Sequence, residues 1–339
     1  MAYNELGATI PQSEGYDTDD SGFFEDVSML TESVRSSIYD YKYENGRRYH
    51  AYKEGQYFMP NDEPEQERML MQHRAGYLAL GKRHFFAPIG DNPQRILDLG
   101  TGTGVWSIEM ADRFPSAEII GVDLSPIQPS WVPPNVKFEV DDIEDEWTFA
   151  ENHFDFVFSK VMLAGSIADF RKYFEQAYKH TRPGGYFEIQ ELTTQISSDH
   201  YNIPETSAIK EWCENMRQGI QVMGRHLDLK FDEIGQMMRD VGFEEVTVIP
   251  FKQPIGAWPA NATLKEAGAI QLVAMLEGME SLSLAIFCRC LQWDTERVAA
   301  LLARTRREFA MKKACYYWPG VVIYGRKPII YQPLHEQPG

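Results

Sequence analysis

The middle of the chain alternates short apolar runs with longer stretches in which apolar residues recur at helical spacing. The short runs predict strands at 95–99, 118–124, 136–140, 154–160, 186–192 and 242–249, the last with room to extend to residue 255. The longer stretches predict helices at 105–114, 167–181, 204–224 and 230–241. Strands that alternate with helices indicate an α/β fold.

The N-terminal part of the chain has a different character. Residues 1–30 are polar and acidic, and we expect them to be disordered. Residues 31–90 are predicted to form an N-terminal helical lid segment, with helices at 30–43 and 63–86. The tyrosine-rich run between these helices either fixes the segment to the core with aromatic contacts or covers a binding site with its hydroxyls pointing inward.

The remaining chain divides into a core and a cap. We expect residues 91–256 to form the α/β core, including helices within 204–241 that face a substrate. Trp212 and its apolar neighbours would wall a pocket, although ordinary core packing gives the same spacing. Residues 257–314 are predicted to be a helical cap, inserted before a closing strand and tail at 315–339. This cap offers a surface for a substrate or for a second copy of the chain.

A glycine-rich turn follows the first core strand. The strand ends in Gly100, Gly102 and Gly104, and a helix begins directly afterwards. Glycine allows a sharp turn and a closer approach of a ligand than any Cβ permits. The dinucleotide-binding pattern requires a third glycine where this chain has Val105. Asp98 lies within the strand itself, which is a further feature of the motif.

Acidic residues also stand at the ends of the next two strands. Asp123 closes the second strand, where a carboxylate can accept both hydroxyls of a ribose. Asp142 follows the third strand, where an acid can accept from an adenine amino group while Ile143 packs on the ring. An ordinary glycine turn does not explain three acidic strand ends at this spacing.

Composition and charge narrow the classes of function. The chain has 339 residues and a net charge of −17, which disfavours nucleic acid as the main substrate. Its four cysteines have no metal-binding spacing and fit a reducing, cytoplasmic compartment. The apolar stretches at 267–276 and 281–288 are too short to span a membrane, and no signal peptide is visible. We expect no metal site.

The chain resembles the fungal LaeA-like branch of the class I S-adenosylmethionine-dependent methyltransferases from about Tyr39 to Arg326. The similarity rests on the tyrosine-rich run, on the sequence Pro-Asn-Asp-Glu at 60–63, and on the motifs at 97–106, 122–126 and 141–147. It implies a Rossmann-like, seven-stranded sheet with helices on both faces and an antiparallel last strand. It also implies S-adenosylmethionine as cofactor and secondary metabolism as the setting.

The resemblance and the motifs together predict the site. The cofactor-binding candidates are Asp98, Gly100, Thr101, Gly102, Gly104, Asp123, Leu124, Asp142, Ile143, Ser159, Tyr49 and Tyr57. The residues at 159–163 follow the fourth strand, and in this class they line the methyl-transfer site. The Asn-Pro-Pro-Tyr type of tetrapeptide is absent there, which disfavours nucleobases and amides as acceptors.

No residue is assigned to catalysis with certainty from the sequence. His73, Glu191 and His226 are the candidates for a base or a substrate contact, and each is also explained as a packed or solvated residue. The sulfonium group of the cofactor is already electrophilic, so alignment of the acceptor can suffice. A base is needed only when the acceptor arrives protonated.

Three functions remain open at this stage. The first is a methyltransferase that acts on a small-molecule secondary metabolite at oxygen, nitrogen, sulfur or carbon. The second is a LaeA-like regulatory factor that works through velvet-type protein partners, for which a nuclear location would be expected. Only scattered basic pairs such as Arg47-Arg48 support nuclear targeting. The third is an enzyme that keeps the cofactor but catalyses a cyclisation or rearrangement.

Overall fold

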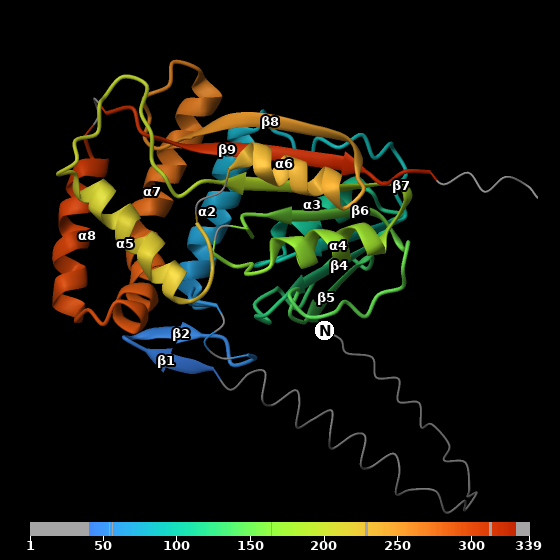
Figure 1. The fold of residues 1–339 in the computed structure, drawn as a ribbon, viewed down its shortest axis with the longest axis horizontal. Coiled ribbons are helices and arrows are strands. Elements are labelled where there is room, and N and C mark those ends of the chain that lie inside the picture. Colours follow the sequence, from blue (N-terminus) through green and yellow to red (C-terminus); the bar gives the residue numbers. More distant parts are fainter. Residues whose placement is uncertain are drawn as a thin grey trace, which may run out of the picture.

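The computed structural model describes residues 41–329, except residues 54, 56, 164, 228–229 and 312–313 (Figure 1). The acidic tail at 1–30, most of the helix expected at 30–43 and the end of the chain after residue 329 lie outside the described residues.

A seven-stranded sheet organises the described chain. Its order is β5-β4-β3-β6-β7-β9-β8, and β9 runs antiparallel to both of its neighbours. The strands are β3 (Arg95–Leu99), β4 (Glu118–Asp123), β5 (Val136–Val140), β6 (Phe154–Lys160), β7 (Thr181–Leu192), β8 (Glu244–Pro254) and β9 (Tyr317–Arg326). The predicted α/β fold with an antiparallel last strand is confirmed.

Helices cover both faces of this sheet because the strands bury side chains on both sides. On one face, α4 (Phe170–His180) and α6 (Phe231–Asp240) pack on a core that includes Leu97 and Phe187. On the other face, α3 (Val105–Arg113) packs on a core that includes Ile96 and Phe158. Ile96 and Leu97 are neighbours on one strand, so their side chains point to opposite faces.

A helical cap packs beside the sheet. It consists of α5 (Ala208–Val222), α7 (Ala262–Ala285), the π-helix η1 (Ile286–Cys290) and α8 (Thr295–Phe309), which lie together beside the sheet (Figure 1). These helices share one apolar core, so α5, which we expected within the α/β core, is counted with the cap from here on. By length and composition, the continuous helix Ala262–Cys290 is apolar enough to cross a membrane, whereas the two apolar stretches within it, 267–276 and 281–288, were each expected to be too short. However, 61% of its most apolar window is buried in the protein, and this burial accounts for the composition.

The N-terminal segment differs from the expected pair of helices. Its described part begins with a two-stranded hairpin, β1 (Lys42–Glu44) and β2 (Arg47–Tyr49), where the end of a helix was predicted. The turn of this hairpin carries Asn45 and Gly46 in left-handed conformations, which is typical of a tight hairpin turn. The helix α2 (Glu63–Ala79) begins as predicted at its Asp62 cap but ends before residue 86.

The helix α2 joins the sheet to the cap. It contacts α7 of the cap, α3 and β8. Arg68 lies buried at the α2–α7 contact and is bound by Glu65, with Nε 2.9 Å from Oε1. A Cβ atom at Gly278 of α7 would lie 2.0 Å from Cδ of Arg68, so the absence of a side chain there permits the contact.

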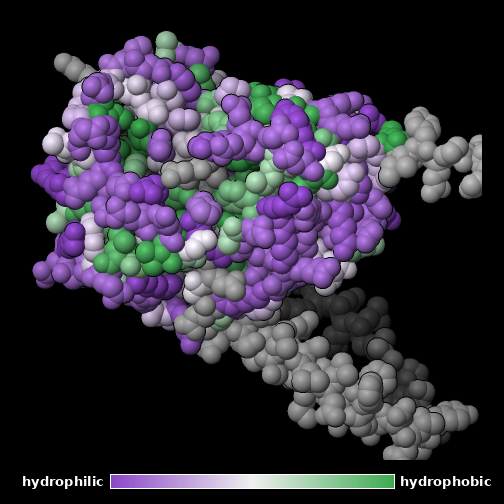
Figure 2. Space-filling view, in the orientation of Figure 1, coloured by the Kyte–Doolittle hydropathy of each residue, from purple (hydrophilic) through white to green (hydrophobic). Residues whose placement is uncertain are grey.

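On the face drawn in Figure 2, the apolar patches are small and separated by hydrophilic side chains. The expectation that the helical insertion forms a homodimer surface stays a prediction.

We expect the substitution Gly278→Val to separate α2 from α7. The valine side chain would overlap Arg68, and overpacking of this kind lowers the free energy of unfolding by about 1 to 3 kcal/mol. Chemical denaturation measures the loss. The matched control is Glu277→Val, which adds the same side chain at an exposed neighbouring position and should stay within about 0.5 kcal/mol of the wild type. Equal stability of the two variants would contradict the packing argument.

Candidate cofactor and substrate site

A cavity of about 280 Å³ lies at the carboxyl ends of the central strands. The ends of β3, β4, β5 and β6 form one side of it. The cap and the ends of β7 and β9 also line the cavity. The apolar lining residues from these elements are Leu192, Trp212, Met216, Leu282 and Trp318. In an open α/β sheet, ligands bind outside the carboxyl ends of the strands, so the cavity is the expected place for a cofactor.

The glycine turn after β3 shapes the first side of the cavity. Gly100 and Gly102 have φ values of +69° and +55°, which side chains rarely adopt. The N–H of Gly100 donates to the carbonyl of Val122 at 2.9 Å and ties the turn to β4. Buried Asp98 accepts the hydroxyl of Thr101 at 2.6 Å, and burial raises the pKa of Asp98 to about 6. The turn is therefore held by a backbone hydrogen bond to β4 and by the side chain of Asp98 on β3.

Asp123 stands at the end of β4 with its carboxylate fixed by backbone donors. One oxygen accepts the N–H of Gly102 at 2.8 Å, and the other accepts the N–H of Ser125 at 2.9 Å. Burial raises the pKa of Asp123. A carboxylate has about four lone-pair sites, so each oxygen keeps one for a ligand that donates hydrogen bonds. The residue lines the cavity and fits a ribose diol.

The lid segment meets the end of β5 at Asp142. One carboxylate oxygen of Asp142 accepts the N–H of Glu144 at 2.9 Å, and the other binds Nζ of Lys53 at 2.8 Å. Lys53 belongs to the loop after β2 and also forms an ion pair with Asp145. This contact brings the loop over the acid that was predicted to bind an adenine. Tyr57 from the same loop lines the cavity.

The structure brings most of the predicted cofactor residues together. Those that line the cavity are Asp98, Gly100, Thr101, Gly102, Asp123, Leu124, Asp142, Ile143 and Tyr57. Their assignment to individual parts of the cofactor stays a prediction.

Three predicted cofactor residues do not line the cavity. Gly104 caps α3 with φ +76°, and a Cβ there would lie 2.4 Å from the ring of Phe138. Ser159 is fully buried, because its neighbours on β6 point to the cavity and it points to the opposite face. Tyr49 packs in the cap core beneath Arg289, with 4.6 Å from Cζ to the ring centroid.

Two of the three catalytic candidates also lie away from the main cavity. His226 is exposed and does not line the cavity. Glu191 is fully buried and lines a second cavity of about 20 Å³. One of its oxygens accepts the N–H groups of Met162 and Leu163 at 2.9 and 3.1 Å, so it positions the backbone after β6. Burial raises the pKa of Glu191 to about 8.

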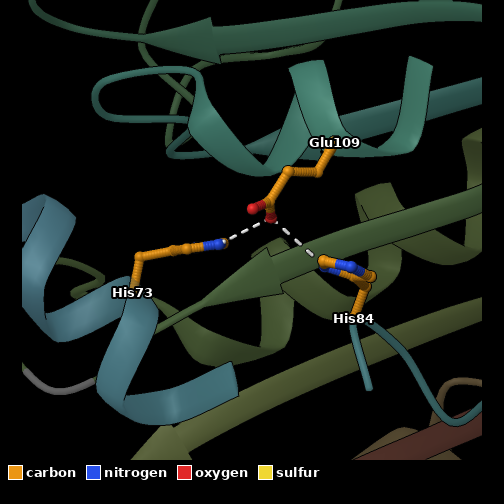
Figure 3. A group of neighbouring side chains, drawn as sticks. All are labelled: His73, His84 and Glu109. Carbon is orange, nitrogen blue, oxygen red and sulfur yellow. Dashed lines mark hydrogen bonds and ion pairs between the residues drawn. The ribbon is translucent and has the colours of Figure 1, made fainter. Parts of the chain in front are cut away.

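His73 lines the main cavity and belongs to a group of three neighbouring side chains that meet at one carboxylate (Figure 3). Its Nε2 lies 2.7 Å from Oε2 of Glu109, and Nδ1 of His84 lies 3.2 Å from the same oxygen. Burial lowers the pKa of His73. Burial alone would raise the pKa of Glu109, but hydrogen bonds from both histidines lower it to about 2. Glu109 therefore orients a neutral His73 at the cavity wall.

These three side chains are also spaced closely enough to hold a metal ion, with their ligand atoms within 4.8 Å of one another. The hydrogen bond between His73 and Glu109, together with the ion-pair contact of His84 with the same oxygen, also accounts for this arrangement. The expectation that the protein has no metal site stays a prediction.

Sequence reasoning missed several wall residues. Leu282 and Trp318 come from α7 and from β9, far along the chain from the glycine turn. Lys160 was named only as one of the residues after the fourth strand, yet it lines both cavities. Its position at the carboxyl end of β6 is the signal by which it can be recognised.

Glu191 makes the stability of the protein depend on pH. Its pKa is higher in the folded protein than the usual 4.5, so its contribution to stability is complete below that value and is lost as the pH rises through about 8. We expect the substitution Glu191→Gln to flatten the fall of the melting temperature between pH 5 and pH 8. The exposed control Glu67→Gln should keep the wild-type slope. Parallel curves for both variants and the wild type would refute this.

The chain matches known proteins over most of its length. The sequence profile of the family described as "Methyltransferase domain" matches residues 71–248. "Methyltransferase pytC" of Aspergillus terreus is 38% identical over 89% of this chain and 93% of its own length. "Secondary metabolism regulator LAE1" of Cochliobolus heterostrophus is 32% identical over 81% of this chain and 91% of its own length.

Among solved structures, phosphoethanolamine N-methyltransferase 2 of Haemonchus contortus, solved with S-adenosyl-L-methionine, matches with a TM-score of 0.49. It is 17% identical and covers 91% of this chain and 75% of its own. The family assignment rests on the sequence matches. The chain belongs to the methyltransferase family, in its fungal LaeA-like branch, and is an S-adenosylmethionine-dependent methyltransferase.

Proposed function

We propose that this methyltransferase acts on an apolar small molecule of secondary metabolism, which binds in the cap half of the main cavity. The observation that carries the proposal is an apolar wall within the cavity. Trp212 and Met216 of α5, Leu282 of α7 and Trp318 of β9 form that wall. A wall of aromatic and aliphatic side chains with few polar groups is typical of small-molecule sites.

The same proposal places the cofactor in the other half of the cavity. The turn at Gly100 and Gly102 would hold the methionine end, Asp123 the ribose, and Asp142 with Ile143 the adenine. Their positions along one wall support this order, because β3, β4 and β5 are adjacent in the sheet. When bound, the cofactor supplies an electrophilic methyl group, and the chain aligns the acceptor with it.

His73 is the proposed base when the acceptor arrives protonated. It is the one catalytic candidate from the sequence that lines the main cavity. Its lowered pKa keeps the ring neutral at pH 7, so that it can take a proton. Glu109 binds the ring at Nε2 and stabilises the imidazolium that forms.

A second candidate function is regulation through protein partners of the velvet type. The 32% identity to "Secondary metabolism regulator LAE1" favours it. A nuclear location would accompany this role, whereas the proposed enzyme fits the cytoplasm, where free cysteines such as Cys213 stay reduced. Extracts of strains with and without the protein distinguish the two: a metabolite heavier by one methyl group supports the enzyme, and a stable protein partner without such a product supports regulation.

The substitution Asp123→Ala tests the cofactor site. We expect calorimetric affinity for S-adenosylhomocysteine to fall about 10- to 100-fold, because hydrogen bonds to a charged group each contribute about 1.5–3 kcal/mol. The control is Asp112→Ala, which removes an exposed carboxylate from α3. Unchanged affinity in the Asp123 variant would rule out its role with the ribose.

The substitution His73→Gln tests the base. We expect the methylation rate of a hydroxyl acceptor found by mass screening to fall about 100-fold or more, with little change in S-adenosylhomocysteine affinity. The wild-type rate should persist below pH 6.5, because the pKa of His73 is lowered. The control is His200→Gln, on an exposed residue. An equal methylation rate in the wild type and His73→Gln would exclude His73 as the base. A wild-type rate that EDTA abolishes would indicate a metal ion at His73, His84 and Glu109.

A further inference from the structure

Lys160 places an unpaired ammonium group at the cavity wall. It is the last residue of β6, and it lines both the main cavity and the smaller one. Among the residues that the structure describes, no hydrogen bond or ion pair reaches its Nζ atom. Burial lowers the pKa of Lys160 to about 8, so the group is still mostly charged at pH 7. The side chain is half-buried, and a charge that is partly removed from water is stabilised by an anionic partner.

The helix α2 leaves room for this ammonium group. Gly76 lies within α2, where glycine costs roughly 1 kcal/mol relative to alanine. A Cβ atom at Gly76 would lie 3.0 Å from Nζ and 3.4 Å from Cε of Lys160. His73 is three residues earlier, on the same face of the helix. Lys160 and the proposed base therefore face the same end of the cavity.

None of the acidic groups around Lys160 forms a direct ion pair with it among the described residues. Asp98 of β3 and Glu109 of α3 act on Lys160 through space and raise its pKa against the effect of burial. Asp98 accepts the hydroxyls of Thr101 and Ser107, and Glu109 is held by two histidines. Glu191 of β7 shares the smaller cavity: Oε1 accepts backbone N–H groups, and Oε2 has no hydrogen-bond partner among the described residues. Burial raises the pKa of Glu191 to about 8, so this group is mostly protonated at pH 7 and does not neutralise the ammonium. An anion from outside the chain would complete the site.

We propose that Lys160 binds an ionised oxygen of the substrate, so that this enzyme methylates molecules with an acidic hydroxyl: a phenol, an enol or a carboxylic acid. This inference rests on the proposed function and adds the substrate class. Next to an ammonium group, the hydroxyl loses its proton more readily, and His73 takes that proton. The acceptor oxygen then forms a bond to the methyl carbon while the carbon–sulfur bond breaks and its electron pair stays on sulfur. Lys160 keeps its proton throughout.

The probe for this site is 4-nitro-1-naphthol, whose neutral and anionic forms differ in visible absorbance. It is titrated with pH while bound to the protein in the presence of S-adenosylhomocysteine. In the wild type, we expect the pKa of the bound probe to lie about 1 to 3 pH units below that of the free probe. This shift should vanish in Lys160→Met and persist in Lys160→Arg. The exposed control Lys265→Met should match the wild type.

A second variant keeps the lysine but moves it. In Gly76→Ala, the new methyl group would displace Nζ, and we expect a smaller shift of the probe pKa than in the wild type. 1-Nitronaphthalene, which has no ionisable group, should bind the wild type and Lys160→Met equally. Weaker binding of 1-nitronaphthalene to Lys160→Met than to the wild type would mean that the substitution damaged the cavity. This result would overturn the conclusion that the charge of Lys160 causes the shift of the probe pKa.

The remaining outcomes separate this inference from the proposed function. Equal probe pKa values in the wild type and Lys160→Met overturn it, and so does a wild type that binds S-adenosylhomocysteine but not the probe. If Lys160→Met weakens S-adenosylhomocysteine instead and leaves the probe unchanged, the anion is the carboxylate of the cofactor, and the substrate assignment is wrong. If the wild type binds no S-adenosylhomocysteine, the proposed function itself fails.

Discussion

Buried carboxylates that accept hydrogen bonds hold the carboxyl edge of the sheet in place. Each stands at or near the end of a strand and reaches a neighbouring loop, so that the loops are fixed by the sheet beneath them. Glu188 of β7, for example, accepts the N–H groups of Phe86 and Ala87 at 2.7 and 2.6 Å. Asp98, Asp123 and Glu191 do the same at the glycine turn and after β6. The site is built on these contacts.

Holding loops in this way has an electrostatic cost. Burial raises the pKa of Asp98 to about 6, of Glu188 to about 7 and of Glu191 to about 8, so each takes up a proton at a higher pH than a carboxyl group in water. Asp123 keeps two backbone donors and lies at the cavity, where a ligand can add more. The carboxylates that hold loops and the carboxylate proposed to bind a ligand therefore use the same chemistry, and Asp98 and Asp123 both line the main cavity.

The features that depend on local sequence could be predicted. The strands and their glycine turn follow from apolar periodicity and from residues that only a tight turn requires. The meeting of Asp98, Asp123 and Asp142 follows from parallel strands, because their carboxyl ends lie on one edge of a sheet. The hairpin at 42–49 was not predicted, since its short strands alternate too briefly to compete with a helical pattern.

The incorrect site predictions have a different cause, which is the direction in which a side chain points. Ser159 and Lys160 are adjacent, and a change of one position decides which of them reaches the cavity. Sequence alone places both at the end of a strand without saying which face is open. Tyr49 and Tyr57 both belong to the tyrosine-rich run of the lid. Tyr49 packs in the cap core, whereas Tyr57 lines the cavity. Such choices depend on tertiary packing, which the local sequence does not show.

The net charge of this protein and the charges at its cavity wall have opposite effects on an anionic ligand. A chain with a net charge of −17 repels anions at long range, and salt screens that repulsion beyond about 10 Å. Within the cavity, screening is weak and the nearest groups dominate. There the carboxylates of Asp98 and Glu109 are bound by hydroxyls and histidines, whereas the ammonium of Lys160 has no direct partner among the described residues. The acidity of the whole chain therefore does not argue against an anionic acceptor at this wall.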